Sequence, residues 1–267
     1  MESPKGTLYL VPNLLAPPTD SGSTAEALLP AVAVARIRSL RRFVVEGDKA
    51  AWRLLSSLMD RESLAAVTLE RLDEHTPREE LPRLLAPALG GEDLGLLSEA
   101  GLPCVADPGS ALASLAHDRG IRVVPLVGPS SLIMALSASG LDGQRFSFLG
   151  YLPQEPAARR AALAAIDRGV AADGATRLFI ETPYRNDRLL ADCLTTLGPE
   201  TRLCVAVSLT SAGERVYSRS VAEWRKAPPL IGKEPAVFLV GRVPGTSLDR
   251  PSGFDHSASR ICKNKKR

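Results

Sequence analysis

The sequence predicts an α/β protein of two domains, with a mostly parallel sheet in the N-terminal domain, a mixed sheet in the C-terminal domain, and helices flanking both. In the first half of the chain, short apolar strands alternate with helical segments, as they do in parallel sheets. Beyond Gly140 the strands follow one another in a pattern that permits antiparallel pairing. A length of 267 residues suits two domains of ordinary size.

The stretch 94–139 organises the first half of the chain. Its pattern is that of a strand, a Gly/Pro loop, a helix, a second strand, a second Gly/Pro loop and a helix. Both loops follow predicted strands, and open α/β sheets bind ligands at the carboxyl ends of their strands. We therefore expect a small molecule to bind beside the loops 99–103 and 128–131.

Hydrophobic periodicity and turn residues predict the other elements of the first half. A helix capped by Ser23 or Thr24 is expected to continue past Pro30 to Ala35, because proline is tolerated near the start of a helix. Another helix is expected around 50–58, and one starts after Thr76 and Pro77. Strands are expected at 6–11, 43–46, 64–69, 94–97 and 121–127.

The second half is expected to hold strands at 145–153, 176–183, 201–209 and 236–243, a short strand and helix between 213 and 226, and helices at 156–168 and 186–197. We assign residues 1–127 to the N-terminal domain and 128–245 to the C-terminal domain. The basic segment 246–267 is expected to be disordered.

The composition favours a globular protein over a dedicated nucleic-acid-binding module. Hydrophobic residues make up 45% of the chain and charged residues 24%, which is ordinary for such proteins. The formal net charge is only +3, and much of this excess comes from the residues 260–267. That basic end permits contact with RNA without indicating it.

The cysteines and the apolar runs predict neither a metal site nor a membrane segment. Cys104, Cys193, Cys204 and Cys262 lie far apart, with no histidine at ligand spacing, so no zinc site and no disulfide framework are indicated. No apolar run approaches the ~20 residues that cross a bilayer, and the N-terminus lacks the pattern of a signal peptide. We expect a cytoplasmic protein with no metal and no membrane contact.

Several familiar catalytic motifs are missing from the sequence. It contains no GxGxxG after a strand, no GxxxxGK[ST], no GxSxG and no HExxH. Hydrolysis of nucleoside triphosphates, the usual nicotinamide fold and esterase chemistry are therefore disfavoured.

The two Gly/Pro loops contain the residue types that recognise a ligand through main-chain groups. Gly101 allows a backbone to approach a ligand closely, and Pro103 holds the turn. Ser130 and Ser131 place hydroxyls and free amides at a helix N-terminus, where a carboxylate or phosphate can bind. Taken singly, each loop is also explained as a tight turn or a helix cap. Their occurrence after strands of adjacent units favours a ligand site.

Several segments in a fixed order carry a family resemblance. SEAGLPCVADPG is followed by VVPLVGPSSLIMALSASGL and FLGYLP, and GTLYLV, FIETPYR and AVSLT occur at matching places. These segments resemble the tetrapyrrole (corrin/porphyrin) methylase superfamily, in its branch of 16S rRNA (cytidine) ribose 2′-O-methyltransferases. The resemblance extends over about residues 6–243.

This resemblance implies a two-domain α/β fold, a homodimer, and S-adenosyl-L-methionine as a methyl donor bound in the cleft between the domains. Asp107 is expected either to contact the donor or to hold its own turn. The other donor contacts that the motifs imply are Leu10, Pro12, Gly101, Leu102, Pro103, Val105, Ser130, Ser131, Ile180, Glu181, Ala206 and Pro235.

The sequence departs from the family on the side of the methyl acceptor. The family's TPIGNLxD is replaced by PNLLAPPTD, and its AEDTR by VEGDKA, which keeps only the glutamate, Glu46. Its DAGTP is replaced by EAGLP, with Leu102 in place of threonine. The donor side is therefore better matched than the acceptor side.

Two residues are candidates for catalysis at the acceptor. Glu46 lies at the end of a predicted strand, where its carboxylate could accept a proton from an acceptor hydroxyl; an ordinary ion pair at the surface is the alternative. His75, in the segment EHT, is similar to a family histidine and is a weaker candidate, because an isolated histidine is more often structural.

Three functions are consistent with these observations. The first is an S-adenosylmethionine-dependent methyltransferase that acts on RNA, with ribosomal RNA as the favoured substrate. The second keeps the methyl donor and replaces RNA by a tetrapyrrole or another small molecule. The third is a dimeric protein that binds the donor without catalysis.

Overall fold

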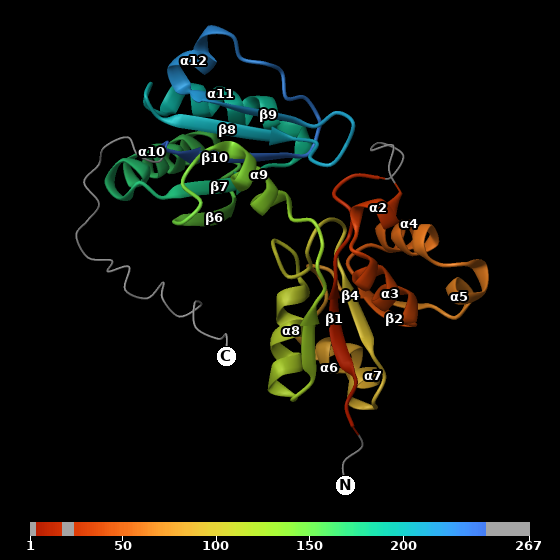
Figure 1. The fold of residues 1–267 in the computed structure, drawn as a ribbon. Helices are drawn as coiled ribbons and strands as arrows, with labels where there is room; N and C mark the ends of the chain where they lie inside the picture. Colours follow the sequence, from red (N-terminus) through yellow and green to blue (C-terminus); the bar gives the residue numbers. More distant parts are fainter. Residues whose placement is uncertain (1–3, 18–23, 244–267) are drawn as a thin grey trace, which may run out of the picture.

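The computed structural model describes residues 4–17 and 24–243. Within these residues the chain forms two α/β units, each built on a five-stranded sheet (Figure 1). The N-terminal unit holds the strands β1 to β5, and the C-terminal unit holds the strands β6 to β10. The predicted helix cap Ser23 and the basic segment 246–267 lie outside the described residues.

The N-terminal sheet is parallel in every pairing that the structure records. Its strands have the order β3-β2-β4-β1-β5. Both faces of this sheet are covered by a hydrophobic core. Within β1, Tyr9 packs in the core on one face and Leu8 in the core on the other. The strands are β1 (Thr7–Val11), β2 (Arg42–Val45), β3 (Thr68–Arg71), β4 (Leu94–Leu97) and β5 (Arg122–Pro125).

The strand order creates a site for a ligand. From β1 the chain continues to β2 on one side of the sheet, and from β4 it continues to β5 on the other side, although β1 and β4 are direct neighbours. The two connections pass over opposite faces of the sheet, with residues 25–37 packed on one face and residues 112–116 on the other. Such a switch point opens a crevice at the carboxyl ends of the strands.

Helices cover both faces of the N-terminal sheet (Figure 1). The apolar sides of α3 and α4 pack on one face, while α6 and α8 pack on the other. The helices of this unit are α2 (Ala25–Leu28), α3 (Ala31–Ser39), α4 (Asp48–Leu58), α5 (Arg61–Ala65), the 3-10 turn η1 (Arg78–Glu80), α6 (Leu81–Leu84), α7 (Ala86–Leu89) and α8 (Gly109–Asp118).

Two predictions for this unit are wrong. The single helix through Pro30 is two helices, because Leu29 adopts the extended backbone that a following proline requires, with φ −111° and ψ 140°. The strand at 64–69 begins only at Thr68. Asp60 starts α5 instead, since its carboxylate accepts a hydrogen bond from the Ser63 amide at 2.7 Å and keeps Leu64 helical.

The C-terminal sheet is mixed, as predicted. Its order is β6-β7-β10-β8-β9, with β6 and β7 parallel and the other pairs antiparallel. The strands are β6 (Phe146–Tyr151), β7 (Thr176–Ile180), β8 (Arg202–Val207), β9 (Arg215–Ser220) and β10 (Ala236–Gly241). The helices are α9 (Ser131–Ser139), α10 (Pro156–Asp173), the 3-10 turn η2 (Pro183–Arg185), α11 (Asn186–Thr196) and α12 (Val221–Lys226).

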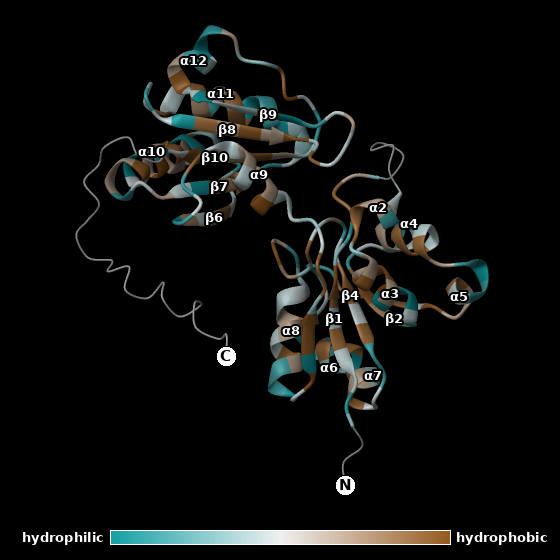
Figure 2. Ribbon diagram, in the orientation of Figure 1, coloured by the Kyte–Doolittle hydropathy of each residue, from teal (hydrophilic) through white to brown (hydrophobic). Residues whose placement is uncertain are grey.

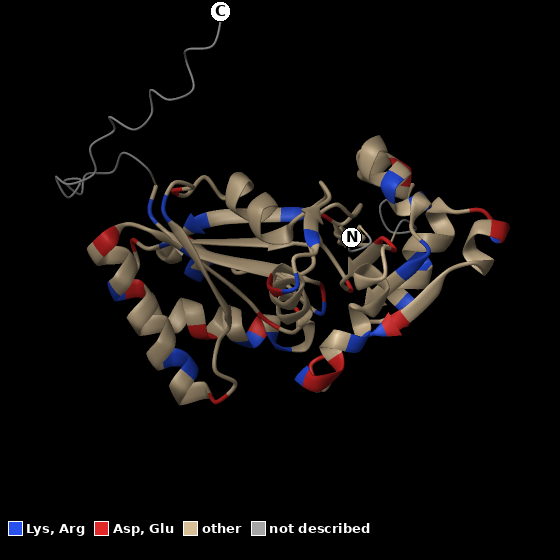
Figure 3. Ribbon diagram, turned by 90° about the horizontal axis from the view of Figure 1, so that it is seen from below, with Lys and Arg blue, Asp and Glu red and all other residues tan. Residues whose placement is uncertain are grey.

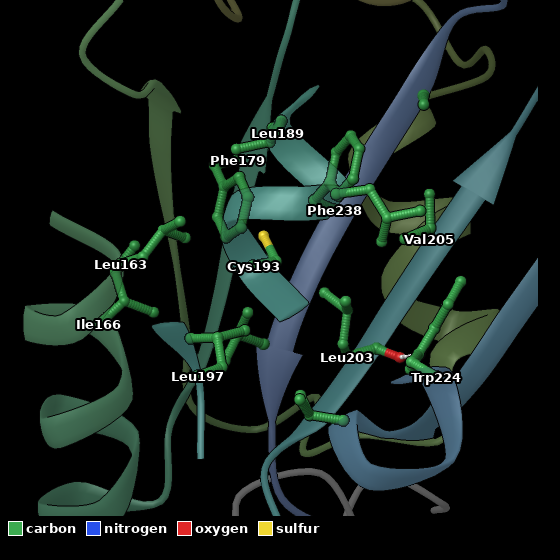
Figure 4. Packing of buried hydrophobic residues seen from close by; sticks show 14 of the residues in the cluster. Leu163, Ile166, Phe179, Leu189, Cys193, Leu197, Leu203, Val205, Trp224 and Phe238 are labelled. Atoms are coloured by element: carbon green, nitrogen blue, oxygen red, sulfur yellow. Dashed lines mark hydrogen bonds between the residues drawn. The ribbon is translucent and has the colours of Figure 1, made fainter. Parts of the chain in front are cut away.

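The larger core of this unit lies between the sheet and the helices α10, α11 and α12 (Figure 4). Phe179 and Phe238 stack there with their ring centroids 5.8 Å apart. Trp224 is fully buried, and its indole N–H donates to the Leu203 carbonyl at 2.8 Å, so its one polar group is satisfied. Figure 2 shows the same apolar character along the central strands β8 and β10 of this sheet.

The helix α9 packs on the opposite face of this sheet, where Ala135 and Leu136 are buried. The link between β5 and α9 thus joins the two units, and the predicted domain division at 127/128 falls within it. No helix among the described residues is long and apolar enough to span a bilayer.

Candidate functional site

A cavity of about 430 Å³ lies where the carboxyl edge of the parallel sheet faces the C-terminal unit. This volume is within the range of small-molecule sites, ~300–1,000 Å³. The N-terminal unit lines it with residues that follow β1, β2 and β4, and the C-terminal unit lines it from β6, β7, β8, β10 and the start of α9. We call this space the interunit cavity.

Most of the site residues that the sequence predicts line the interunit cavity. They are distant in the chain and reach the cavity from different strands and loops. Those that line it are Glu46, Gly101, Leu102, Val105, Asp107, Ser130, Ser131, Ile180, Glu181, Ala206 and Pro235.

Four predicted residues do not line the cavity: Leu10, Pro12, Pro103 and His75. Pro12 packs behind it, against Gly128, where any Cβ would lie 2.1 Å from the Cβ of Pro12. Leu10 is held in β1 between β4 and β5. His75 lies in the turn after β3, with its side chain 85% exposed.

Asn13 holds the loop after β4 in place, a role that the sequence did not reveal. Its backbone exchanges hydrogen bonds with Gly101, of 2.8 and 3.2 Å. Its side-chain amide donates to the carbonyls of Ser98 and Glu99, both at 3.0 Å. Asn13 is only 5% exposed, so this network is part of the core. The loop therefore has a fixed shape beside the cavity.

The backbone is strained on both sides of the cavity. Among the described residues, the non-glycine residues with positive φ are Cys104, Ala106, Ser208 and Thr210, with φ between +51° and +69°. The first two lie in the loop after β4 and the other two in the loop after β8. Such conformations cost on the order of 1–3 kcal/mol each and tend to occur at functional sites.

Asp107 holds the first strained loop through one of its two carboxylate oxygens. Oδ1 accepts hydrogen bonds from the amides of Cys104 and Gly109, both at 2.8 Å. Oδ2 is buried and has no hydrogen-bond partner among the described residues. The turn-holding role is thus visible in the structure, and the residue also lines the cavity.

Glu181 is a second carboxylate with one satisfied and one free oxygen. It follows β7, and its Oε1 accepts hydrogen bonds from the Arg185 guanidinium at 2.6 Å and from the Thr182 amide at 2.7 Å. Its Oε2 is buried without a partner in the described part of the chain. A buried oxygen without a partner is costly, so a hydrogen-bond donor from a ligand would satisfy it.

Glu46 lies at the end of β2, on the wall of the cavity. Burial raises the pKa of its carboxyl, and the negative charges of Asp107, Glu99 and Glu74 raise it further. A hydrogen bond of 3.0 Å from the Glu99 amide to Oε2 lowers this pKa in part. A partly buried carboxylate with a raised pKa is a better proton acceptor than an exposed one.

Ser130 occupies the N-cap position of α9, but its side chain makes no capping hydrogen bond. Capping therefore does not explain this serine, which lines the cavity together with Ser131. The N-terminus of α9 thus lies at the cavity, and the free amides of a first helical turn suit a carboxylate group.

The sequence did not reveal several residues of the C-terminal wall. Phe148 and Tyr151 line the cavity from β6, and the FLGYLP segment could have indicated both. Other such residues come from the loops after β7 and β8: Pro183, Ser208, Leu209 and Ser211. On the N-terminal wall, the sequence also did not reveal Leu15, in the loop after β1.

Cys104 lies beside the cavity, and burial raises its pKa to about 11, so its thiol stays protonated at neutral pH. Cys193 and Cys204 are free and buried. Within the described ranges, no three His, Cys, Asp or Glu side chains are grouped so that they could hold a metal ion.

Together, the parallel sheet, the mixed sheet and the cavity between them define an α/β protein with a cavity of small-molecule size between its two units. A model of the family Tetrapyrrole (Corrin/Porphyrin) Methylases matches residues 21–224. The chain belongs to this family, which confirms the resemblance in its motifs.

Curated relatives are similar over different shares of the chain. "Ribosomal RNA small subunit methyltransferase I" of Pseudomonas aeruginosa is 42% identical over 150 residues, which cover 56% of this chain and 52% of the relative. The protein of the same name from Neisseria meningitidis serogroup B is 31% identical over 258 residues, 97% of this chain and 82% of the relative. The match therefore spans about half the length of the first relative and most of the second.

A solved structure supports the fold alone. The methyltransferase CobJ aligns with a TM-score of 0.59 at 19% identity, over 89% of this chain and 94% of that chain.

Proposed function

We propose that this protein is an S-adenosylmethionine-dependent methyltransferase that methylates a ribose 2′-hydroxyl of 16S rRNA. The observation that carries the proposal is the convergence of motif residues from positions 46 to 235 on one cavity. The acceptor follows from the relatives named for ribosomal RNA, one of which is similar over 97% of this chain. We further propose that the protein is a homodimer and that it acts in the cytoplasm. Its two domains would divide between residues 127 and 128.

The interunit cavity fits the proposed donor. The donor carries an ammonium group, two ribose hydroxyls and an adenine amine, all of which donate hydrogen bonds. Two residues that line the cavity, Asp107 and Glu181, each have a buried carboxylate oxygen without a partner among the described residues. Gly101 has φ +72° and no side chain, which leaves space at this point of the wall. A Cβ at this position would lie 3.3 Å from Leu15 Cδ2.

The proposed donor contacts are of two kinds. Lining residues would touch the donor directly; they are Gly101, Leu102, Val105, Asp107, Ser130, Ser131, Ile180, Glu181, Ala206 and Pro235. Leu10, Pro12 and Pro103 would act from behind, by holding the loops that carry these residues.

When bound, the donor supplies a methyl group on a positively charged sulfur. The protein then has to align the acceptor hydroxyl with that methyl group and provide a base for its proton. Glu46 is the proposed base, because it lines the cavity and its pKa is raised by burial. His75 is exposed at the same edge of the sheet, and we retain it as a contact to RNA outside the cavity.

Methyl transfer to ribosomal RNA tests this proposal. Full-length protein, donor with a labelled methyl group and small ribosomal subunits from cells without this modification are incubated together. We expect one labelled 2′-O-methylated nucleoside in digests of 16S rRNA, and a rate at least tenfold lower for Glu46→Gln. Labelling that is absent from RNA in all ribosomal particles would reject the RNA acceptor.

A further inference from the structure

The charged residues that line the interunit cavity are all acidic. They are Glu46, Glu99, Asp107 and Glu181, and no Lys, Arg or His lines the cavity among the described residues. Elsewhere, acidic and basic residues are interspersed over the outer helices of both units (Figure 3). The absence of cations is therefore a local property of the cavity wall.

The four carboxylates differ in how far their charge is compensated. Glu181 forms an ion pair with Arg185 at 2.6 Å. Glu46, Glu99 and Asp107 form no ion pair with any described residue, and all three stand on the N-terminal wall. This wall thus carries an excess of negative charge, and the raised pKa of Glu46 is one result of it.

A second observation concerns two of these residues, each of which has a buried carboxylate oxygen without a partner in the part of the chain that the structure describes. The side chain of Glu181 is 1% exposed, yet its Oε2 has no partner in the described structure. On the opposite wall, Asp107 Oδ2 is also buried without a hydrogen-bond partner in the described structure. Buried carboxylate oxygens are normally paired, so both await hydrogen-bond donors of positive or polar character.

We propose that the acidic wall of the interunit cavity selects the cationic methyl donor over its neutral demethylated product. This inference rests on the proposed function. S-adenosylmethionine carries one net positive charge, whereas S-adenosylhomocysteine carries none, and the two molecules otherwise have nearly the same shape. Contacts to the adenine, ribose and amino acid groups are therefore shared, and the wall's charge distinguishes the two ligands.

The expected preference follows from Coulomb's law. Two unit charges about 7 Å apart interact strongly enough to change affinity by roughly 3-fold in a water-like dielectric and roughly 50-fold at an effective dielectric of about 20. An exposed carboxylate such as Glu99 would contribute at the lower end of this range, because solvent screens its charge. Such a wall would help the protein to release its product after each reaction.

Titration calorimetry on the full chain tests the inference. Dissociation constants are measured for S-adenosylmethionine, for S-adenosylhomocysteine, and for sinefungin, in which a charged amine stands near the place of the sulfonium. We expect the two cations to bind at least 3-fold more tightly than the neutral product at low salt, and the preference to shrink at high salt.

Two variants remove charge while keeping the local hydrogen bonds. Asp107→Asn retains an Oδ1 that can accept from Cys104 and Gly109, and Glu99→Gln changes a side chain for which no hydrogen bond is recorded. We expect each to reduce the preference for cations by ~3-fold or more. Asp118→Asn is the matched control, because it ends α8 about 14 Å along the helix from the cavity.

Three outcomes separate the possibilities. A preference that falls in the two cavity variants and persists in Asp118→Asn supports the inference. Equal affinity for donor and product in the parent protein, or equal weakening of both in the variants, overturns it and leaves the methyltransferase proposal in place. Failure of all three ligands to bind the folded parent protein rejects both proposals.

Discussion

The two walls of the interunit cavity are built differently. The N-terminal wall follows the ends of parallel strands and carries three carboxylates without ion pairs. The C-terminal wall comes from a mixed sheet and presents aromatic, aliphatic and hydroxyl groups, and its one acid, Glu181, is paired with Arg185. The comparison suggests different roles for the two walls. The N-terminal wall would interact with a ligand through charge and main-chain groups, and the C-terminal wall would pack against it.

The largest expected effect concerns the shape of the N-terminal wall. Gly101→Val places a branched side chain at φ +72° and toward Leu15, so we expect donor affinity to fall by about 100-fold or more. Folding should lose about 1–2 kcal/mol, because a residue with a side chain is strained in the left-handed region. Calorimetry and thermal unfolding measure the two effects separately.

Gly143→Val is the control for this variant, since nothing lies within 4 Å of a Cβ at that position. If Gly101→Val bound the donor as tightly as Gly143→Val does, the loop after β4 would not form part of the donor site.

Asn13→Ala tests how far this wall depends on its support from the core. The substitution removes a donor to Ser98 and Glu99 and leaves two carbonyl groups without that partner. We expect a loss of about 1–3 kcal/mol in the free energy of unfolding. Donor affinity should fall as well, by roughly tenfold, because the loop loses its fixed shape. Chemical denaturation and calorimetry on the same sample check both values.

Ser130→Ala tests the boundary between the two walls. Because the Ser130 side chain does not cap α9, its removal should hardly change stability, while donor affinity should fall several-fold. Ser220→Ala provides the contrast, since Ser220 does cap α12, by accepting from the Glu223 amide at 3.2 Å. That control should lose about 1 kcal/mol of stability and no affinity. The reverse pattern would make Ser130 a structural residue.

The smallest expected effect is the pH dependence at Glu46. A carboxyl whose pKa is higher in the folded than in the unfolded state binds more protons when folded, so stability falls as pH rises from its ordinary pKa through the raised one. Above that window Glu46→Gln should therefore be slightly more stable than the parent, by about 1 °C in Tm. Thermal scans at pH 4 and pH 7 check this, and a destabilised variant at pH 7 would contradict it.

Part of the cavity lining could be predicted from sequence because local patterns determine it. A glycine after a strand and serines at the start of a helix indicate a ligand site whatever the strand order of the sheet. Gly101, Ser130 and Ser131 do line the cavity. Asp107 was open between two roles, and its two oxygens show why, since one holds the turn and the other has no partner.

Other features depend on contacts between distant segments and could not be predicted. Asn13 matters because β1 lies beside β4, which only the strand order reveals. Local competition explains the two wrong elements. The backbone before Pro30 excludes a continuous helix, and the cap at Asp60 outweighs the strand pattern of the residues that follow.

The central claim is that the two walls together hold a cationic methyl donor. Titration of the full-length protein with S-adenosylmethionine tests it most directly, with Gly101→Val measured alongside. We predict binding of one donor per chain at micromolar or lower concentration, and its loss in the folded variant. No binding at high micromolar concentration, or equal binding by the variant, would contradict the claim.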